Sequence, residues 1–376
     1  MPALELDRRT LRLIAIAFLL LTALSVHRLF LAEPPSPPDV LIFSGQTMGT
    51  TYEIRIAGPG LENIQREQVE DETERRLLEI DQWMSNWNPD SDIARFNAHK
   101  ATSDFSVATQ TAEVVAFGLE LTNWSGGAFD LTVGPLVALW GFGHHARIET
   151  NPSEQEISAL RKRTGSEMIR VGLGGGETSA FLAKNDPEVE IDLSAIAKGY
   201  GVDHVANGLE GLGLANYLVE IGGELRASGS RPGGRPWRVA IERPQVEGRA
   251  IQSVIELSDR AMATSGDYRI FYVEKGKHLS HTIDPRTGRP VENGPASVTI
   301  LADTATEADA WATTLMVLGE RDGLPLASRH GIAALILIRS DDGTISERRN
   351  DLFPARTSIQ PNERDEHPGP SEGLVE

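Results

Sequence analysis

The sequence contains no cysteine among its 376 residues. That absence excludes disulfides, thiolate metal sites, cysteine nucleophiles and lipid attachment through a thiol. Positive charge is also scarce: 36 lysines and arginines stand against 54 aspartates and glutamates, which gives a formal net charge of -18. So acidic a surface repels phosphate backbones, and we expect no nucleic acid among the partners. What is present, 40% hydrophobic and 24% charged residues, suits a soluble globular domain with a buried core.

The N-terminus differs in kind from the rest of the chain. Three arginines within residues 8–12 precede an uncharged, mostly apolar run from Leu13 to Val26, and a longer stretch continues to Ala32. The short run suits the core of a signal peptide, whereas the longer stretch is just long enough to span a bilayer. Arginines on this side keep the N-terminus in the cytoplasm, so the remainder would be exported. Because the end of the stretch offers only Ala32 as a small residue for cleavage, we predict an uncleaved signal anchor over residues 1–32.

The remaining organisation predicts one large folded domain between a linker and a tail. Prolines dominate residues 33–41, which we interpret as a stiff extended linker. Residues 346–376 are polar and acidic, and we expect them to be disordered. The folded domain is expected over residues 42–345. Helices and hairpins are interleaved in it without the βαβ rhythm of a parallel sheet, so the predicted fold class is α+β, with mixed helices and antiparallel sheet.

Hydrophobic spacing predicts the main elements of this domain. Helical spacing is found at Val69–Trp83, Glu113–Trp124, Ser194–Leu209 and Glu307–Leu318, the last closed by Gly319. Strand-like segments are Tyr52–Ile56, Tyr217–Ile221, Trp237–Ile241, Val254–Leu257, Tyr268–Val273, Ala296–Leu301 and Ile332–Ile338. The glycine-rich run from Gly172 to Gly176 has the look of a dinucleotide-binding loop, but no helix pattern opens after it and no βαβ unit surrounds it. We therefore interpret it as a hairpin turn.

The segment from Ile191 to Gly201 is the first candidate for chemistry. A strand-like end leads into Asp192 and Ser194, which have the character of helix N-caps, and then into a helix that carries Lys198. Free backbone N–H groups at a helix start, with a lysine in its first turns, can hold a phosphate. An ordinary cap beside a solvated lysine explains the same residues equally well.

A second candidate is the pair Asp309 and Thr313, which are four residues apart and therefore share one face of a helix. Their carboxylate and hydroxyl are hard oxygen ligands of the kind that Mg2+ prefers. The competing explanation is helix capping. Thr304 and Glu307 form a capping-box pattern, and Thr306 with Asp309 forms a looser one. For the pair in isolation, capping is the simpler explanation.

Three turns complete the set of candidate segments. His281 precedes an Asp-Pro-x-x-Gly turn that ends at Gly288, and a histidine in such a place is either a surface residue or a general base near neutral pH. Gly126 to Asp130 and Gly222 to Glu224 are glycine-led turns that each present an acid. Taken singly, each reads as an ordinary turn.

Taken together, the segments resemble the ApbE family, the FAD:protein FMN transferases. The resemblance covers about residues 44–338 and rests on six motifs that occur in the family's fixed order. They are Met48-Gly49-Thr50, Ala128-Phe129-Asp130, the run from Asp192 to Gly199, Gly222-Gly223-Glu224, Ser280-His281 with Ile283-Asp284-Pro285, and Glu307-Ala308-Asp309-Ala310.

The resemblance implies a flavin-transferase fold and a reaction that uses FAD and Mg2+. A threonine or serine hydroxyl of an acceptor protein would attack the FMN phosphorus, and AMP would leave. By position in the motifs, the metal ligands would be Asp309, Thr313 and the main-chain oxygen of Ala195. The residues that contact FAD would be Met48, Trp87, Ala128, Phe129, Asp130, Asp192, Lys198 and Ile283. His281 is the catalytic candidate, as the base for the incoming hydroxyl.

Two positions depart from the family's usual pattern. Trp87 stands where a tyrosine is more common, before the Arg-Phe-Asn that ends at Asn97. Ala312 stands where some members have an acid. The metal shell would then depend more on waters and phosphate oxygens, which Mg2+ normally keeps.

The resemblance also suggests a partner and a place. The acceptor would carry a threonine in a short Ser/Thr-Gly-Ala-Thr-like segment of a membrane redox subunit. With the predicted anchor, the protein would sit in the bacterial inner membrane with its catalytic domain facing the periplasm. Two alternatives stay open. An FAD pyrophosphatase would use the same site with water, and a non-catalytic periplasmic flavin-binding protein would need the FAD contacts but neither the metal pair nor His281.

Overall fold

The structure is a computed structural model, and it describes most of the chain between Val40 and Ala355. The described ranges are 40–58, 60–61, 64–143, 151–175, 179–245, 250–267, 271–274, 277–292, 294–340 and 342–355. The predicted anchor over residues 1–32, nearly all of the linker and the tail beyond residue 355 lie outside these ranges. Within them, no helix is both long and apolar enough to cross a bilayer.

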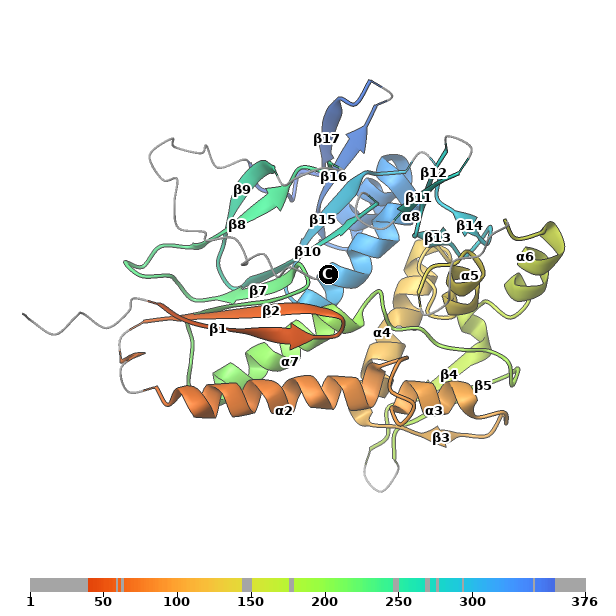
Figure 1. Cartoon of the computed structure of the whole chain (residues 1–376), viewed down its shortest axis with the longest axis horizontal. Helices are drawn as coiled ribbons and strands as arrows, with labels where there is room; N and C mark the ends of the chain where they lie inside the picture. The colour runs from red at the N-terminus through yellow and green to blue at the C-terminus, as the bar shows by residue number, and fades with distance from the viewer. Residues whose placement is uncertain are drawn as a thin grey trace, which may run out of the picture. The chain divides into compact units, whose positions relative to one another are not determined.

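An eight-stranded sheet forms the centre of the domain, in the order β1-β2-β6-β7-β10-β15-β16-β17 (Figure 1). Every neighbouring pair in it is antiparallel. The strands are β1 (Val40–Thr47), β2 (Thr50–Ala57), β6 (Tyr217–Ile221), β7 (Glu224–Ser228), β10 (Arg260–Gly266), β15 (Ser297–Ala302), β16 (Ala333–Arg339) and β17 (Ile345–Arg349). The predicted mixture of helices and antiparallel sheet is confirmed.

Helices cover one face of this sheet, and a hairpin covers the other. The helices are α2 (Arg66–Met84), α4 (Thr109–Ser125), α7 (Ala197–Gly211) and α8 (Ala305–Arg329). Side chains of β6 alternate between the faces: Tyr217 and Val219 pack with α2 and α7, whereas Leu218 packs against the hairpin of β8 (Trp237–Glu242) and β9 (Ile251–Leu257). This period of two residues buries apolar side chains on both sides.

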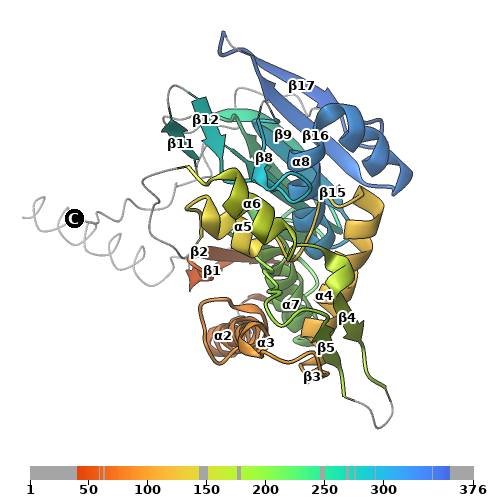
Figure 2. The same cartoon turned by 90° about the vertical axis from the view of Figure 1, so that its right-hand side faces the viewer.

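Smaller elements surround these layers, and Figure 2 shows several of them beside α4. They are α3 (Asp92–Ala98), α5 (Gly134–Leu139), α6 (Glu154–Arg161), a 3-10 turn (Ser166–Met168), and the strands β3 (Phe105–Ser106), β4 (Ile169–Gly172), β5 (Phe181–Lys184), β11 (Phe271–Glu274), β12 (Lys277–Ser280), β13 (Ile283–Asp284) and β14 (Arg289–Pro290). Because β4 pairs antiparallel with β5, the strand that ends at Gly172 is one arm of a hairpin, as predicted, and Gly176 lies outside the described residues.

Three boundaries differ from the sequence predictions. Helix α7 begins at Ala197 rather than Ser194, and Asp192 accepts a hydrogen bond from Ser194 N instead of capping the helix. Helix α8 is broken at Gly319, as predicted, but helical backbone resumes to Arg329. The predicted start of the tail at residue 346 is too early, because β17 extends from Ile345 to Arg349. Asn350 is also buried, and its side-chain amide donates to Ile332 O.

Candidate functional site

The site is built where the start of α7 crosses α8, beside the sheet (Figure 1). Gly199 permits this crossing. A Cβ at that position would lie 2.1 Å from Ala305 O and 2.8 Å from Asp309 Cβ, which no side chain tolerates. The missing side chain therefore lets the two helices approach closely. As a result Lys198, in the first turn of α7, faces Asp309 on α8.

Lys198 lies between two buried carboxylates. Its Nζ is 2.9 Å from Glu224 Oε1 and 3.5 Å from Asp309 Oδ1. The two carboxylate side chains are 5% and 3% exposed, whereas that of Lys198 is 29% exposed. Lys198 is therefore the member of the group that incoming solutes can reach, and the acids lie behind it.

The electrostatics of this group follow from burial and proximity. Burial opposes the charge on Lys198, but Asp309 and Glu224 outweigh it and raise the pKa of Lys198 above its ordinary value. Burial raises the pKa of Glu224 above its ordinary value, and the attraction of Lys198 opposes this rise. The site therefore holds a fixed cation with two buried carboxylates around it.

Asp309 is not a helix cap. Thr304 caps α8 by accepting from Glu307 N, as the capping-box pattern predicts. The hydroxyl of Thr306 turns to Asp203 of α7, whose carboxylate also accepts from Ala305 N. The capping positions are thus filled by other groups. Asp309 instead accepts from Gly199 N (3.0 Å) with one oxygen and faces Lys198 with the other.

The oxygen donors around Asp309 fit a hard cation such as Mg2+. Thr313 lies one turn further along α8, with its Oγ1 3.5 Å from Ser265 Oγ of β10. Ala195 lies in the turn before α7, partly buried against the largest core cluster. Among the described residues no group of three or more histidines and carboxylates is arranged to hold a metal. A cation here would therefore combine one carboxylate with hydroxyl and main-chain oxygens, and Mg2+ completes such a set with waters and phosphate oxygens.

The turn between β1 and β2 lies next to this group. Met48 has a left-handed backbone (φ 49°) and is 37% exposed. A Cβ on Gly201 of α7 would be 3.5 Å from Met48 Sδ. A Cβ on Gly222 would lie 2.8 Å from Thr50 Cγ2 and 3.4 Å from Lys198 Cδ, so this turn and the β6–β7 turn both pack around the lysine. The predicted FAD residue Met48 thus packs on α7 at Gly201, about one helical turn after Lys198.

Asp192 connects the segment before α7 to two other predicted regions by hydrogen bonds. Its Oδ1 accepts from Asn86 Nδ2 (2.9 Å), and Asn86 is the immediate neighbour of Trp87. Its main-chain N–H donates to Leu131 O (2.7 Å), just after the Ala128–Asp130 turn. Trp87 itself is 71% exposed. Trp87 therefore lies at the surface, next to a side chain that is held by Asp192.

The Ala128–Asp130 turn is rigid and mostly buried. Ala128 is 1% and Phe129 3% exposed. The carboxylate of Asp130 accepts hydrogen bonds from the main-chain and hydroxyl groups of Thr132 and Ser166. In this arrangement the Asp130 side chain fixes the turn, and the parts of the turn left for a ligand are main-chain groups.

His281 begins the hairpin of β13 and β14, which packs on α5 and α6. Ile283 is buried with Leu136 and Trp140, and the indole N–H of Trp140 donates to Gly288 O (2.8 Å). The ring of His281 lies edge-on to Phe142, with centroids 6.3 Å apart. This hairpin reaches the preceding turn, because a Cβ on Gly127 would contact Arg286 Cγ at 3.6 Å.

Comparison with known proteins decides the family. The ApbE family profile matches residues 48–336. A curated relative from Vibrio cholerae, named FAD:protein FMN transferase, is 45% identical over 316 residues, or 84% of this chain and 92% of the relative. A relative of the same name from Escherichia coli is 38% identical over 304 residues, or 81% of this chain and 86% of the relative. This chain belongs to the ApbE family.

Solved ApbE structures share the fold described above. The flavin transferase ApbE from Vibrio cholerae matches with a TM-score of 0.76 and 43% identity, over 84% of this chain and 99% of that chain. The flavinyl transferase ApbE of Pseudomonas stutzeri, in its apo form, matches with a TM-score of 0.74 and 40% identity, over 83% and 95% of the two chains. The likeness therefore extends over the whole sheet and its helices.

The structure brings several of the predicted residues together, and it adds neighbours that sequence reasoning missed. The sequence predicts Lys198, Asp309 and Thr313, which the structure brings together, and it predicts the turn at Gly222 without a role for Glu224. Ser265 carries no motif signal, because it lies in a strand of small residues. Ala312, which stands where some family members have an acid, is fully buried in the largest core cluster.

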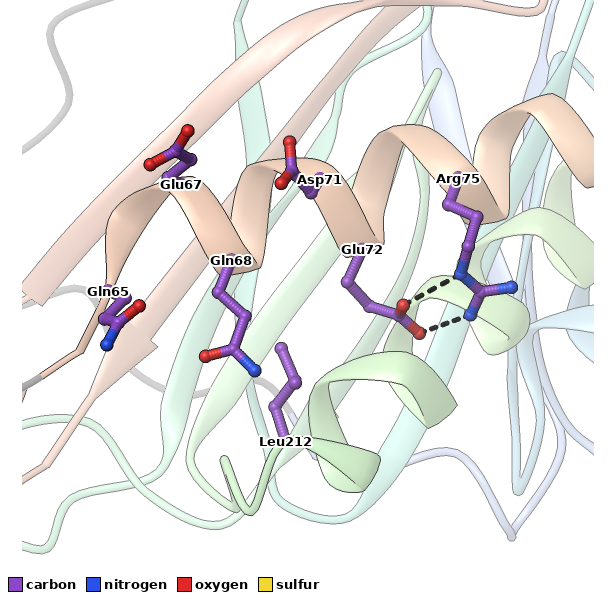
Figure 3. Close-up of a pocket in the computed structure, with 7 residues that line it drawn as sticks. All are labelled: Gln65, Glu67, Gln68, Asp71, Glu72, Arg75 and Leu212. Carbon is purple, nitrogen blue, oxygen red and sulfur yellow. Dashed lines mark hydrogen bonds and ion pairs between the residues drawn. The ribbon is translucent and has the colours of Figure 1, made fainter.

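A shallow pocket on α2 lies away from the site (Figure 3). Its lining is mainly acidic and polar: Gln65, Glu67, Gln68, Asp71, Glu72, Arg75 and Leu212. Glu72 holds Arg75 by two hydrogen bonds, which leaves the surface negative overall. Leu212 is at the far end of α7 from Lys198. Acidic walls repel a diphosphate, so this pocket does not suit FAD.

Proposed function

We propose that this protein transfers the FMN half of FAD to a threonine or serine hydroxyl of an acceptor protein, with Mg2+ as cofactor and AMP as the second product. Membership of the ApbE family supports the activity. The observation that carries the mechanism is the buried group of Lys198, Glu224 and Asp309 at the crossing of α7 and α8. A fixed cation beside an oxygen-ligand set suits a diphosphate more than any other common ligand group.

The chain's own residues bind and orient the diphosphate. Lys198 is accessible enough to meet a phosphate oxygen, and the buried acids keep it charged and in place. The N-cap residue of α7, Ile196, has no side chain that can cap the helix, and Asp309 of α8 accepts from Gly199 N in the first turn instead. The flavin and adenosine parts would contact Met48, Trp87, Asp192, Ile283 and main-chain groups of the Ala128–Asp130 turn.

Asp309, Thr313 and the main-chain oxygen of Ala195 would hold the metal. Bound Mg2+ supplies charge neutralisation at the phosphate oxygens. Since phosphoryl-group transfer depends mainly on positioning and electrostatics, these residues need no covalent role.

His281 is proposed as the general base that accepts the proton of the acceptor hydroxyl. The acceptor hydroxyl oxygen bonds to the FMN phosphorus, and the bond from that phosphorus to the bridging oxygen breaks, so that AMP leaves with that oxygen. A ring nitrogen of His281 accepts the hydroxyl proton. The hairpin that carries His281 is fixed by buried Ile283 and by the Trp140 bond to Gly288, which suits a group that must hold one orientation.

We further propose that the catalytic domain is held at the periplasmic side of a bacterial inner membrane by residues 1–32. The acceptor would be a membrane redox subunit with a Ser/Thr-Gly-Ala-Thr-like segment. The supporting observations are the basic flank and the apolar run at the N-terminus, which predict a membrane segment with the rest of the chain exported.

The proposal is tested by incubating the protein with FAD, with and without Mg2+, and measuring AMP. Release of AMP that requires Mg2+ and rises when acceptor protein is added supports the transferase. Release of AMP and free FMN at a rate that does not depend on the acceptor would instead identify an FAD pyrophosphatase. Tight flavin binding without AMP would identify a binding protein and overturn the proposal.

A further inference from the structure

Glu224 is a buried acid that contacts neither FAD nor the metal in the proposed chemistry. It begins β7, directly after the β6–β7 turn, and its side chain is 5% exposed. Its Oε1 contacts Lys198, whereas its Oε2 is buried and has no hydrogen-bond partner in the described part of the chain. An unpartnered buried carboxylate oxygen is costly, so its retention calls for a reason.

The contacts of Asp309 give a reason for the presence of Glu224. The Oδ2 of Asp309 accepts from Gly199 N, so Oδ1 is the oxygen that has no backbone donor among the described residues and is the better placed of the two for a cation. That oxygen already faces the ammonium of Lys198 at 3.5 Å. If Asp309 were the only partner of Lys198, the lysine and a metal ion would compete for this oxygen, and a lysine that is only 29% exposed is disfavoured without a carboxylate partner.

We infer that Glu224 is the positioning residue that keeps Lys198 in place when Asp309 binds the metal, so that lysine and metal act on the diphosphate together. Glu224 is suited to this because its contact with Lys198 is the shorter of the two, 2.9 Å against 3.5 Å. The β6–β7 turn fixes it from the backbone: Gly222 and Gly223 have φ of 63° and 107°, and Gly222 packs on the stem of Lys198. This inference rests on the proposed function, since it concerns the same metal site.

The test measures Mg2+ affinity without turnover. ADP is the probe, since it carries a diphosphate and no flavin to transfer. In saturating ADP, Mg2+ is titrated while the thermal-unfolding midpoint is followed for wild type, Glu224→Gln, Lys198→Met and the double variant. In Glu224→Gln the lysine turns fully to Asp309, so half-maximal stabilisation should need about 5- to 30-fold more Mg2+, as for coupled contacting groups. In the Lys198→Met background the same change should shift the Mg2+ requirement by less than about 2-fold.

The cycle separates this inference from simpler explanations. An equal shift in both backgrounds would mean that Glu224 acts only through its own negative charge, and the inference would be wrong. An unchanged Mg2+ requirement in Glu224→Gln would overturn it as well. Should Glu224→Gln fold poorly, Glu224→Asp serves in its place, with a smaller shift in the same direction expected. If the wild type does not release AMP from FAD, the proposed function is wrong. The inference about Glu224 is tested separately, because the titrations of the four proteins use only ADP and Mg2+ and need no turnover.

Discussion

At the scale of single residues, Asp309 shows how structure resolves a choice that sequence leaves open. The sequence is compatible with a capping role, because acids near a helix start stabilise its dipole. In the structure Thr304 and Asp203 satisfy the first turn of α8, and Asp309 lies one turn further along with its carboxylate turned to α7. Asp309 does not cap its own helix, its side chain is 3% exposed, and it faces Lys198, which supports its prediction as a site residue.

Asp309→Asn is therefore expected to keep the fold and lose catalysis. The amide oxygen can still accept from Gly199 N, so the unfolding free energy should fall by no more than about 1–3 kcal/mol. FMN transfer at low Mg2+ should fall by orders of magnitude, because the metal loses its only carboxylate. Activity is compared with the folded fraction from circular dichroism. If activity falls only in proportion to the unfolded fraction, Asp309 has a structural role and is not a metal ligand.

His281→Ala is expected to separate binding from chemistry. A general base contributes roughly 10²–10⁴-fold to a rate and much less to ground-state affinity. FAD binding, followed by flavin fluorescence, should stay near wild type, while FMN transfer slows by about that factor. Asp284 is a poor replacement, because both of its oxygens bond the guanidinium of Arg286 at 2.9 Å. Matched losses of affinity and rate would show that His281 only shapes the pocket.

At the scale of elements, the sequence predicts what depends on periodicity and misses what depends on pairing. The helices α2, α4, α7 and α8 follow from apolar residues at helical spacing, and β6 and β16 from compact apolar runs. Strand β10 is missed, because its residues are small and polar and its place is set by β7 and β15 on either side. The partnership of Glu224 with Lys198 is missed for the same reason: it exists only once β7 and α7 are packed together.

The crossing of α7 and α8 gives a matched pair of variants in one helix. Gly199→Ala should destabilise the protein by about 1–3 kcal/mol and reduce activity further, because its Cβ would press on Ala305 O and on Asp309. Gly201→Ala should be tolerated or stabilising by up to about 1 kcal/mol, since its Cβ would meet its neighbours at 3.5 Å or more and alanine favours helix. Thermal unfolding and transfer rates check both. Equal behaviour of the two variants would contradict a tight crossing at Gly199.

At the scale of the whole molecule, the catalytic domain is only part of what the sequence encodes. The sequence predicts a membrane segment before it, and the structure does not describe those residues. Intact-mass measurement of membrane-extracted protein should find residues 1–32 still attached, since a convincing cleavage site is lacking. A mature chain that begins near Glu33 would remove the anchor and leave only export. Either result leaves the domain from Val40 onward, with its sheet and site, unchanged.

The central claim is that the protein moves FMN onto another protein, and intact-mass spectrometry of the acceptor tests it most directly. The full chain is incubated with FAD, Mg2+ and a protein that carries a Ser/Thr-Gly-Ala-Thr-like segment, and with a control acceptor whose last threonine is alanine. We predict that the first acceptor gains the mass of one FMN residue, with AMP released in equal amount, and that the control acceptor gains nothing. AMP release with both acceptors unmodified would contradict the account, because water would then be the nucleophile.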